Sequence, residues 1–315
     1  MYEWYKNAFC CFAYLADVTL APCFGDTKAL FQRSRWFDRG WTLQELLASN
    51  FVLFCDKSWH VFGWVGPNCI VNSTPFTTLR AEVSAASGIA MDHLGRGVLR
   101  TSAISIAEKM SWASRRITSR KEDEAYCLLG LFGVNIPLLY GEGEKAFQRL
   151  QQELIKNSND QSIFAWTEIE EDRGKFPGMF ARSARQFRDS GNIRVGPPCA
   201  PYELTNRGLR LRAEYVELPT DFGRIDCLIM ITLNCFVEEL EPPQPDSGYR
   251  RPSSPSYGRR SVFTVLGKHY GIAQWFRESV GATRQVSLED VLTNGVPRRE
   301  TTFYIDAFGR GRYDG

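Results

Sequence analysis

The sequence predicts an α/β core followed by a helical segment and a β-rich C-terminal domain. Two apolar runs, 10–18 and 51–56, flank a helical pattern, which gives the order strand, helix, strand. From residue 103 onward, apolar residues recur at helical spacing. Beyond residue 190, short β-type runs alternate with turn residues. These three observations define the expected architecture.

The α/β part begins with a short amphipathic helix at 1–8 (MYEWYKNA) and a buried strand at 10–18 (CCFAYLADV). A second helix is expected around 42–49. The run 51–56 (FVLFCD) is compact and apolar throughout, as is typical of a strand buried in a parallel sheet.

Three helices are predicted in the segment that follows. The first carries four apolar residues on one face: Ile106, Met110, Ala113 and Ile117. The second covers 120–132, where the spacing of Ser119 and Glu122 indicates a capping box and Gly133 ends the helix. The third runs from about 143 to 156 with a stripe of apolar residues: Phe147, Leu150 and Leu154.

Two features of this helical segment suggest a ligand site and also have simpler interpretations. A basic group is interpreted as a solvated connection between helices, with a phosphate site as the alternative; it consists of Arg115, Arg116, Arg120 and Lys121. The glycines of 140–144 (YGEGE) lack a preceding strand and a third glycine. We therefore interpret them as a turn that enters the helix at 143.

Four β-type runs are expected in the C-terminal part: 202–218, 227–236, 261–267 and 301–308. Residues 241–260 hold five prolines, four serines and four arginines, and we expect a disordered loop between two strands. The expected division is therefore 1–66 for the α/β part, 67–165 for the helical extension and 166–315 for the β-rich domain.

Composition excludes several classes of function. Apolar residues make up 43% of the 315 positions and charged residues 23%. The net charge of +2 is too small to indicate a nucleic-acid or membrane partner, and we expect no nucleic-acid partner. No segment reaches the roughly 18 apolar residues that span a membrane. The nine cysteines are irregularly spaced without a C-x-x-C pair, which indicates reduced thiols. With no targeting segment, we expect a cytoplasmic protein.

Metal and nucleophile motifs are absent from the sequence. His60, His93 and His269 lie far apart and have no partner at metal-ligand spacing, so no metal is expected. Neither G-x-S-x-G nor G-x-x-x-x-G-K-[ST] occurs. These absences argue against a metalloenzyme and a serine hydrolase.

The most informative stretch is 34–49, SRWFDRGWTLQELLAS, which combines aromatic residues and arginines with one carboxylate. Leu43, Leu46 and Leu47 form the buried stripe of a helix, so Glu45 projects off that stripe. A carboxylate beside indoles and arginines can orient a ribose hydroxyl or stabilise a developing cation. The alternative is structural, because Thr42-x-x-Glu45 is also a capping box.

This stretch resembles the central motif of the HET (heterokaryon incompatibility) domain of filamentous fungi. Residues 1–18 resemble the family's upstream helix and strand. Residues 104–156 and DQSIFAW at 160–166 resemble the region that follows the motif in one large branch, and YELTNRGLRL at 202–211 is similar to that branch's β-rich part. The likeness therefore covers most of the chain in order.

The resemblance implies a role in non-self recognition and regulated cell death, through partner proteins or self-association. It also implies a distant relationship to TIR domains, which have a flavodoxin-like fold and in many cases cleave NAD. Trp41 to Leu46 resembles the TIR motif that carries the catalytic glutamate, which would make Glu45 catalytic and NAD the substrate. The residues expected to contact substrate or partner are Arg35, Trp36, Arg39, Gly40 and Trp41.

One departure from the family pattern concerns the N-terminus. A complete HET domain begins with a strand and helix upstream of the helix at 1–8, so the resemblance implies a partial core in an N-terminally truncated chain. Three functions follow as alternatives: a signalling module that acts through association, an NAD glycohydrolase that uses Glu45, and a truncated paralogue without function. We expect catalysis to be lost if the upstream strands are absent, because ligands bind at the carboxyl ends of such strands.

Overall fold

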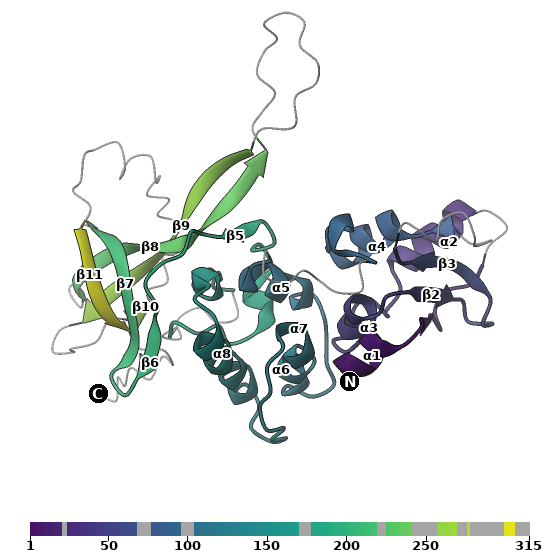
Figure 1. The fold of residues 1–315 in the computed structure, drawn as a ribbon, viewed down its shortest axis with the longest axis horizontal. Coiled ribbons are helices and arrows are strands. Elements are labelled where there is room, and N and C mark those ends of the chain that lie inside the picture. Colours follow the sequence, from purple (N-terminus) through teal and green to yellow (C-terminus); the bar gives the residue numbers. More distant parts are fainter. Residues whose placement is uncertain are drawn as a thin grey trace, which may run out of the picture. The chain divides into compact units, whose positions relative to one another are not determined.

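A computed structural model describes residues 1–20, 24–67, 77–95, 104–169, 178–218, 225–240, 257–269, 276–277 and 299–305. The chain combines helices and sheets in two compact units (Figure 1). Unit 1 comprises Met1–Ala103, Lys109–Glu153 and Ser183–Arg188. Unit 2 comprises Ile104–Glu108, Leu154–Arg182 and Asp189–Gly315.

Unit 1 contains a sheet of order β1-β2-β3-β4. Its strands are β1 (Cys11–Tyr14), β2 (Val52–Cys55), β3 (Val61–Val65) and β4 (Thr77–Thr78). β1 runs parallel to β2, with α2 (Phe24–Gln32) and α3 (Thr42–Ala48) between them in the chain. The predicted strand–helix–strand unit with a parallel pair is confirmed. β3 is antiparallel to β2, so the sheet is mixed.

Alternation along β1 decides which of its faces is covered. Cys11 and Ala13 are buried, whereas Phe12 and Tyr14 are exposed. The buried Ala13 is the register partner of Phe54 on β2, and the Phe31 ring contacts Phe54 edge-on at 5.0 Å between centroids. α1 (Tyr2–Asn7) packs against α3 (Figure 1). This core therefore fixes the position of α3, which carries the central motif.

The helical segment contains α4 (Arg80–Ser87), α5 (Ile106–Ala113), α6 (Asp123–Tyr126), α7 (Leu129–Phe132) and α8 (Lys145–Asn157). The third predicted helix is confirmed, and its three stripe residues are buried in α8. Gly133 follows α7 with a φ of 67°, as expected of a residue that ends a helix.

Two predictions in this segment are wrong. Ile117 lies beyond the end of α5 and is 64% exposed, because the chain leaves the helix after Ala113 to pair with the backbone at Arg39. The single helix expected at 120–132 is two short helices. Its capping box does not form, because the Glu122 carboxylate instead accepts the N–H groups of Gly141 and Gly143.

The C-terminal sheet has the order β10-β9-β8-β7-β11, with β5 on β8 and β6 on β7. Its strands are β5 (Ile193–Val195), β6 (Glu203–Thr205), β7 (Gly208–Leu218), β8 (Ile225–Leu240), β9 (Tyr257–His269), β10 (Phe276–Arg277) and β11 (Arg299–Ile305). The strand pairings among the described residues of this sheet are antiparallel. The predicted runs 227–236 and 261–267 are confirmed within β8 and β9, and the run 202–218 is divided into β6 and β7 by a turn. Of the run 301–308, residues 301–305 lie in β11 and the rest lie outside the described residues.

The predicted loop 241–260 lies between β8 and β9, as expected. Residues 241–256 lie outside the described residues. For 257–260 the prediction is wrong, because these residues begin β9 and pair with the end of β8 in antiparallel register. The long partner strand provides backbone hydrogen bonds that the polar composition of this stretch does not reveal.

Asp160 joins distant segments within unit 2. Its Oδ2 accepts the Ile106 N–H at 2.7 Å, and its Oδ1 accepts the Ser162 N–H at 2.9 Å. Tyr202 donates its hydroxyl to the Asp160 carbonyl at 3.0 Å. The DQSIFAW stretch therefore connects the start of α5 with the β-rich part.

Several absences concern only the described residues. The cysteines placed there are free thiols, and no group of three or more His, Cys, Asp or Glu is arranged to hold a metal ion. His60 is an exposed side chain 3.6 Å from Asp56, and His93 lies beside Trp112. Within the same ranges, none of the helices has the length and apolar character needed to cross a membrane.

Candidate functional site around Glu45

The central motif enters α3 through a turn anchored on Asp17, which follows β1. Ser34 donates its hydroxyl to Asp17 Oδ1 at 2.7 Å, and the Arg35 N–H donates to Oδ2 at 2.8 Å. Burial opposes ionisation of Asp17, but these hydrogen bonds outweigh it and hold its pKa below the usual value. The end of β1 thus fixes the start of the motif.

Thr42 is the first residue of α3 and is buried. Its hydroxyl lies 2.6 Å from the Trp36 carbonyl and 2.8 Å from the Arg39 carbonyl, to which it donates. Trp41 occupies the N-cap position without a side-chain capping bond. The capping box considered for Thr42 and Glu45 is therefore absent, and Glu45 is not needed to cap the helix.

Arg116 holds the motif from the other side. Its Nη1 donates to the Arg39 carbonyl at 2.8 Å and to Thr42 Oγ1 at 2.9 Å, and its Nε donates to the Trp112 carbonyl at 3.1 Å. Its Nη2 is buried without a hydrogen-bond partner. The prediction that Arg116 is solvated is wrong, since its buried side chain hydrogen-bonds both α5 and the motif at 34–49. Arg115, Arg120 and Lys121 are exposed, as expected.

Burial lowers the pKa of Arg116 to about 10, while the thiol of Cys127 and the carboxylates of Asp38 and Glu45 act in the opposite direction. A guanidinium without a directly paired carboxylate is costly to bury, because its hydration is lost. The three oxygens that it bonds offset only part of that loss.

Backbone hydrogen bonds and close packing also join the motif at 34–49 to the residues that follow α5. The Gly40 N–H donates to the Ile117 carbonyl at 3.0 Å, and the Ile117 N–H donates to the Asp38 carbonyl at 2.5 Å. A Cβ on Gly40 would lie 2.5 Å from Thr118 Cγ2 and 3.2 Å from Cys127 Sγ. Glycine is therefore required here by close approach.

Gln44 provides a further link between α3 and the helical segment. Its Nε2 donates to the Cys127 carbonyl, between α6 and α7, at 2.6 Å. Gln44 is 3% exposed, so its amide serves packing rather than ligand contact.

Glu45 lies half-buried on α3, off the leucine stripe as predicted. Burial raises its pKa, although side-chain hydrogen bonds from Tyr5 and Trp36 and the positive charges of Arg39 and Arg116 oppose the rise. The carboxylate is thus held by an aromatic hydroxyl and an indole under the field of two guanidinium groups. Such a perturbed carboxyl is typical of functional sites, and structural networks also produce it.

The neighbours of Glu45 respond to its charge. Burial raises the pKa of Tyr5 to about 12, with Glu45 adding to the rise. Burial also raises the pKa of Cys11 to about 11, and Glu45 again contributes. Both groups therefore stay protonated at neutral pH, so Tyr5 remains a hydrogen-bond donor to Glu45.

The other predicted site residues are distributed unevenly. Arg35 is exposed, and its Nε lies 3.6 Å from Asp17, whereas Arg39 is exposed on the turn before α3. Trp36 is 7% exposed, and its ring contacts Phe37 and Phe54. Gly40 is buried and Trp41 is half-buried. The structure brings Trp36, Arg39 and Glu45 together but directs Arg35 toward Asp17.

Sequence reasoning missed Tyr5 and Arg116. Tyr5 belongs to α1, forty residues before Glu45, and only the packing of α1 on α3 brings it close. Arg116 stands beside Arg115, and an Arg-Arg pair after a helix usually indicates a solvated face. No signal in the sequence separates the buried member of that pair from the exposed one.

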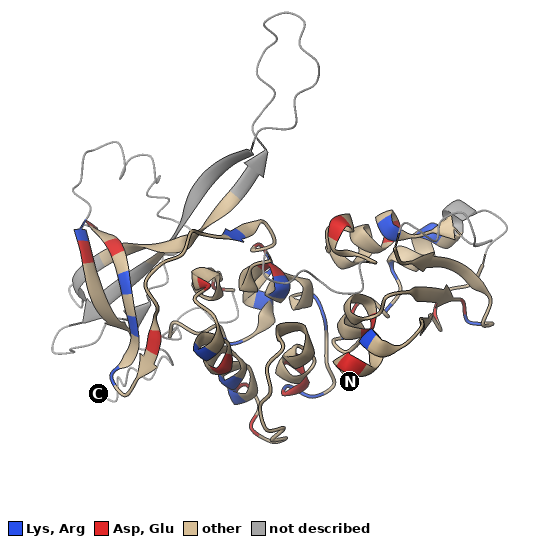
Figure 2. Cartoon of the chain, viewed as in Figure 1, with Lys and Arg blue, Asp and Glu red and all other residues tan. Residues whose placement is uncertain are grey.

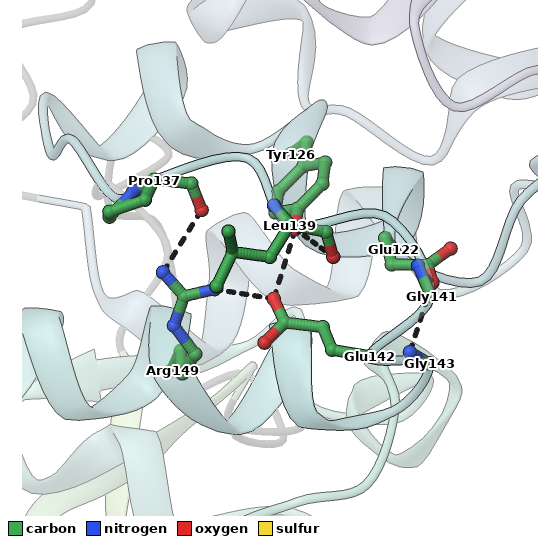
Figure 3. A network of polar contacts seen from close by, with 8 residues as sticks. All are labelled: Glu122, Tyr126, Pro137, Leu139, Gly141, Glu142, Gly143 and Arg149. Atoms are coloured by element: carbon green, nitrogen blue, oxygen red, sulfur yellow. Dashed lines mark hydrogen bonds and ion pairs between the residues drawn. The ribbon is translucent and has the colours of Figure 1, made fainter.

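A second polar network lies around the glycines of 140–144 (Figure 3). Glu142 accepts from the Tyr126 hydroxyl at 2.9 Å and pairs with Arg149, which also donates to the Pro137 carbonyl at 2.9 Å. Gly141 and Gly143 have φ values of 102° and 60°, which favour glycine. These contacts satisfy one another in a turn that leads into α8, as predicted.

Residues 145–190 match a domain of unknown function, DUF8212. The chain is 37% identical over 162 residues to the vegetative incompatibility protein HET-E-1 of Podospora anserina, which covers 50% of this chain and 11% of that protein. The chain thus spans about a tenth of the length of this relative. No solved structure matches the chain.

Half of the chain is therefore related to a fungal vegetative incompatibility protein. This finding supports the resemblance to heterokaryon incompatibility proteins that the motifs indicate.

The close approach at Gly40 predicts a specific destabilisation. Gly40→Ala should lower the free energy of unfolding by about 1–3 kcal/mol, because the added methyl group overlaps Thr118 Cγ2. Thr118→Ser removes that methyl group and keeps the hydroxyl that bonds the Arg120 carbonyl. Urea unfolding should therefore show partial rescue in the double variant. An equal loss with and without Thr118→Ser would contradict the contact.

The raised pKa of Glu45 predicts a pH-dependent effect on stability. The folded chain holds the Glu45 proton more tightly than the unfolded chain, so this stabilisation is present below the unfolded pKa and is lost as pH rises through the folded pKa. Glu45→Gln should therefore be more stable than the parent at pH 7, with the gain shrinking as pH falls toward about 4. Glu3→Gln, an exposed change on α1, is the control. A loss of stability at pH 7 would show that the ionised carboxylate is favoured.

Proposed function

We propose that this chain acts in fungal non-self recognition, as a heterokaryon incompatibility protein that signals regulated cell death. The similarity to HET-E-1 over half the chain carries this proposal. The rigid placement of the motif supports it, since Asp17, Thr42 and Arg116 hold 34–49 from both sides. The chain acts in the cytoplasm through other proteins, by self-association or with an incompatibility partner, and without nucleic acid.

The proposed fold relationship is a TIR-like, flavodoxin-like core in unit 1. It is supported by the parallel pairing of β1 with β2 and by the helices that connect them. The antiparallel β3 lies outside that pattern. The division at residues 66 and 165 stays a prediction of the sequence.

Expression in a filamentous fungus tests the signalling role. Induced expression of the chain, alone or with an incompatible partner strain, should reduce hyphal viability, measured by uptake of a membrane-impermeant dye. Gly40→Ala should weaken the effect, because the added methyl group overlaps Thr118 and so displaces the motif at 34–49. The matched control is Leu138→Ala, at an exposed apolar residue in the same unit. Unchanged viability in every pairing would contradict the proposal.

The second candidate function is NAD cleavage at the nicotinamide glycosidic bond. The observation that favours it is the half-buried Glu45 with its raised pKa beside Trp36 and Arg39. In this chemistry Glu45 would hold a ribose hydroxyl while the bond between the anomeric carbon and nicotinamide breaks and positive charge develops on the sugar. Water would then attack the anomeric carbon and release a proton to solvent. Trp36 and Tyr5 would keep the carboxylate oriented.

Release of nicotinamide from NAD by the purified chain tests this second function. Glu45→Ala should lower the rate on the order of 100-fold, because a positioned carboxylate contributes at least that much to such reactions. Glu3→Ala serves as the surface control. Equal rates in the parent and Glu45→Ala would remove Glu45 from the mechanism. No release by the parent would favour a signalling role, or a paralogue without function, over an enzyme.

A further inference from the structure

The chain that connects α5 to α6 directs alternate side chains inward and outward. Arg116 is buried and Thr118 is half-buried, and both pack against the motif at 34–49. Arg115 and Ile117 are exposed. The outward residues are therefore held in place by the packing of their inward neighbours, although they take no part in that packing themselves.

Ile117 is an apolar side chain exposed to solvent on an ordered backbone. It is 64% exposed, while its N–H donates to the Asp38 carbonyl and its carbonyl accepts the Gly40 N–H. These bonds form a parallel bridge between Ile117 and Arg39. Bridge partners direct their side chains to the same face, so Arg39 lies beside Ile117. Asp38, the next residue along, faces the other side, where its charge acts on Arg116.

Arginines flank Ile117 along the chain and across the bridge. Arg115 precedes it, Arg120 follows it, and Arg39 is its bridge partner. All three arginines are exposed, and none of them forms an ion pair within the part of the chain that the structure describes. Lys121, by contrast, pairs with a carboxylate at 3.0 Å. Lys and Arg residues, blue in Figure 2, thus recur along this connection, and most of their charge is uncompensated.

Arg120 is held in one orientation by an aromatic ring. Its guanidinium lies 4.6 Å from the centroid of the Tyr140 ring, and the Tyr140 hydroxyl donates to Asp123 Oδ1 at 3.0 Å. Stacking on a ring face leaves the N–H groups at the edge of the guanidinium free to bind an anionic group in a bidentate manner. Because the side chain is already ordered, it loses little conformational entropy on binding.

Two observations favour a protein partner over a nucleic acid or a free phosphate. The net charge of +2 provides no extended positive field of the kind that binds nucleic acid. A phosphate would leave Ile117 and the 49% exposed Tyr140 uncovered, whereas a peptide carries apolar side chains beside its acidic ones. Arginine and aromatic residues are also the types enriched in protein interfaces, from which lysine is depleted.

We propose that Arg39, Arg115, Ile117, Arg120 and Tyr140 form a docking surface for an acidic segment of a partner protein. Carboxylates of that segment bind the arginines, and an apolar side chain between them covers Ile117. Side chains on one face of an extended segment are two residues apart, so the expected pattern is acidic–x–apolar–x–acidic. The inference goes beyond the proposed function, since this surface would bind such a segment whether or not the chain acts in cell death.

Fluorescence anisotropy with a labelled synthetic peptide tests the surface. The probe carries glutamate, leucine and glutamate at alternate positions of a glycine–serine sequence. The purified full chain should bind it at low ionic strength, and added salt should weaken binding because exposed charges are screened. Arg115→Glu and Arg120→Glu should each raise the dissociation constant about threefold to tenfold, since an attraction becomes a repulsion. The matched control is Lys57→Glu, the same charge change at an exposed residue between β2 and β3.

Ile117→Ser separates docking of a peptide from simple attraction of anions. It should weaken binding of the leucine probe and leave unchanged the weaker binding of a probe with serine in place of leucine. Circular dichroism of each variant establishes that it folds. Absence of binding by the parent, equal losses in Arg115→Glu and Lys57→Glu, or equal affinity for the two probes would each overturn the proposal. A single-stranded oligonucleotide that displaces the probe at lower concentration than the unlabelled peptide would do so as well.

Discussion

The buried guanidinium of Arg116 is the interaction on which the arrangement of the candidate site depends. It bonds the Arg39 carbonyl and the Thr42 hydroxyl, and so joins the turn before α3 to the end of α5. Thr42 in turn bonds the carbonyls of Trp36 and Arg39. One side chain from the helical segment thus orients the residues that precede Glu45, and it does so without a directly paired carboxylate.

The buried guanidinium of Arg116 also affects the pKa of Glu45. Burial disfavours the ionised carboxylate, whereas the charges of Arg39 and Arg116 favour it, and burial prevails. Arg116 is itself disfavoured as a cation by burial and is supported in part by Glu45. The two groups therefore share a poorly hydrated region in which each limits the shift of the other. Such a balance is unfavourable for stability and useful for a site that must hold a charged or polar ligand.

Local patterns predicted much of the fold but little of the site. The β1–β2 unit, α8 and the greater part of β7, β8, β9 and β11 follow from apolar periodicity, which reports burial directly. The motif pointed to Glu45 and Trp36. Its partners Tyr5 and Arg116 come from α1 and the end of α5, and their roles depend on long-range packing that no local pattern encodes. Arg116 is the clearest example of a role that local sequence does not predict, because it is buried whereas the adjacent Arg115 is exposed.

A double-mutant cycle between Thr42→Val and Arg116→Met measures most directly the interaction energy between the Arg116 guanidinium and the Thr42 hydroxyl. Valine removes the hydroxyl that accepts from Nη1 while keeping the shape of threonine, and methionine removes the guanidinium. The structure predicts a coupling free energy of about 1–3 kcal/mol in urea unfolding, as found for contacting residues in one network. A coupling below about 0.3 kcal/mol, the value expected of independent sites, would contradict the central role of Arg116.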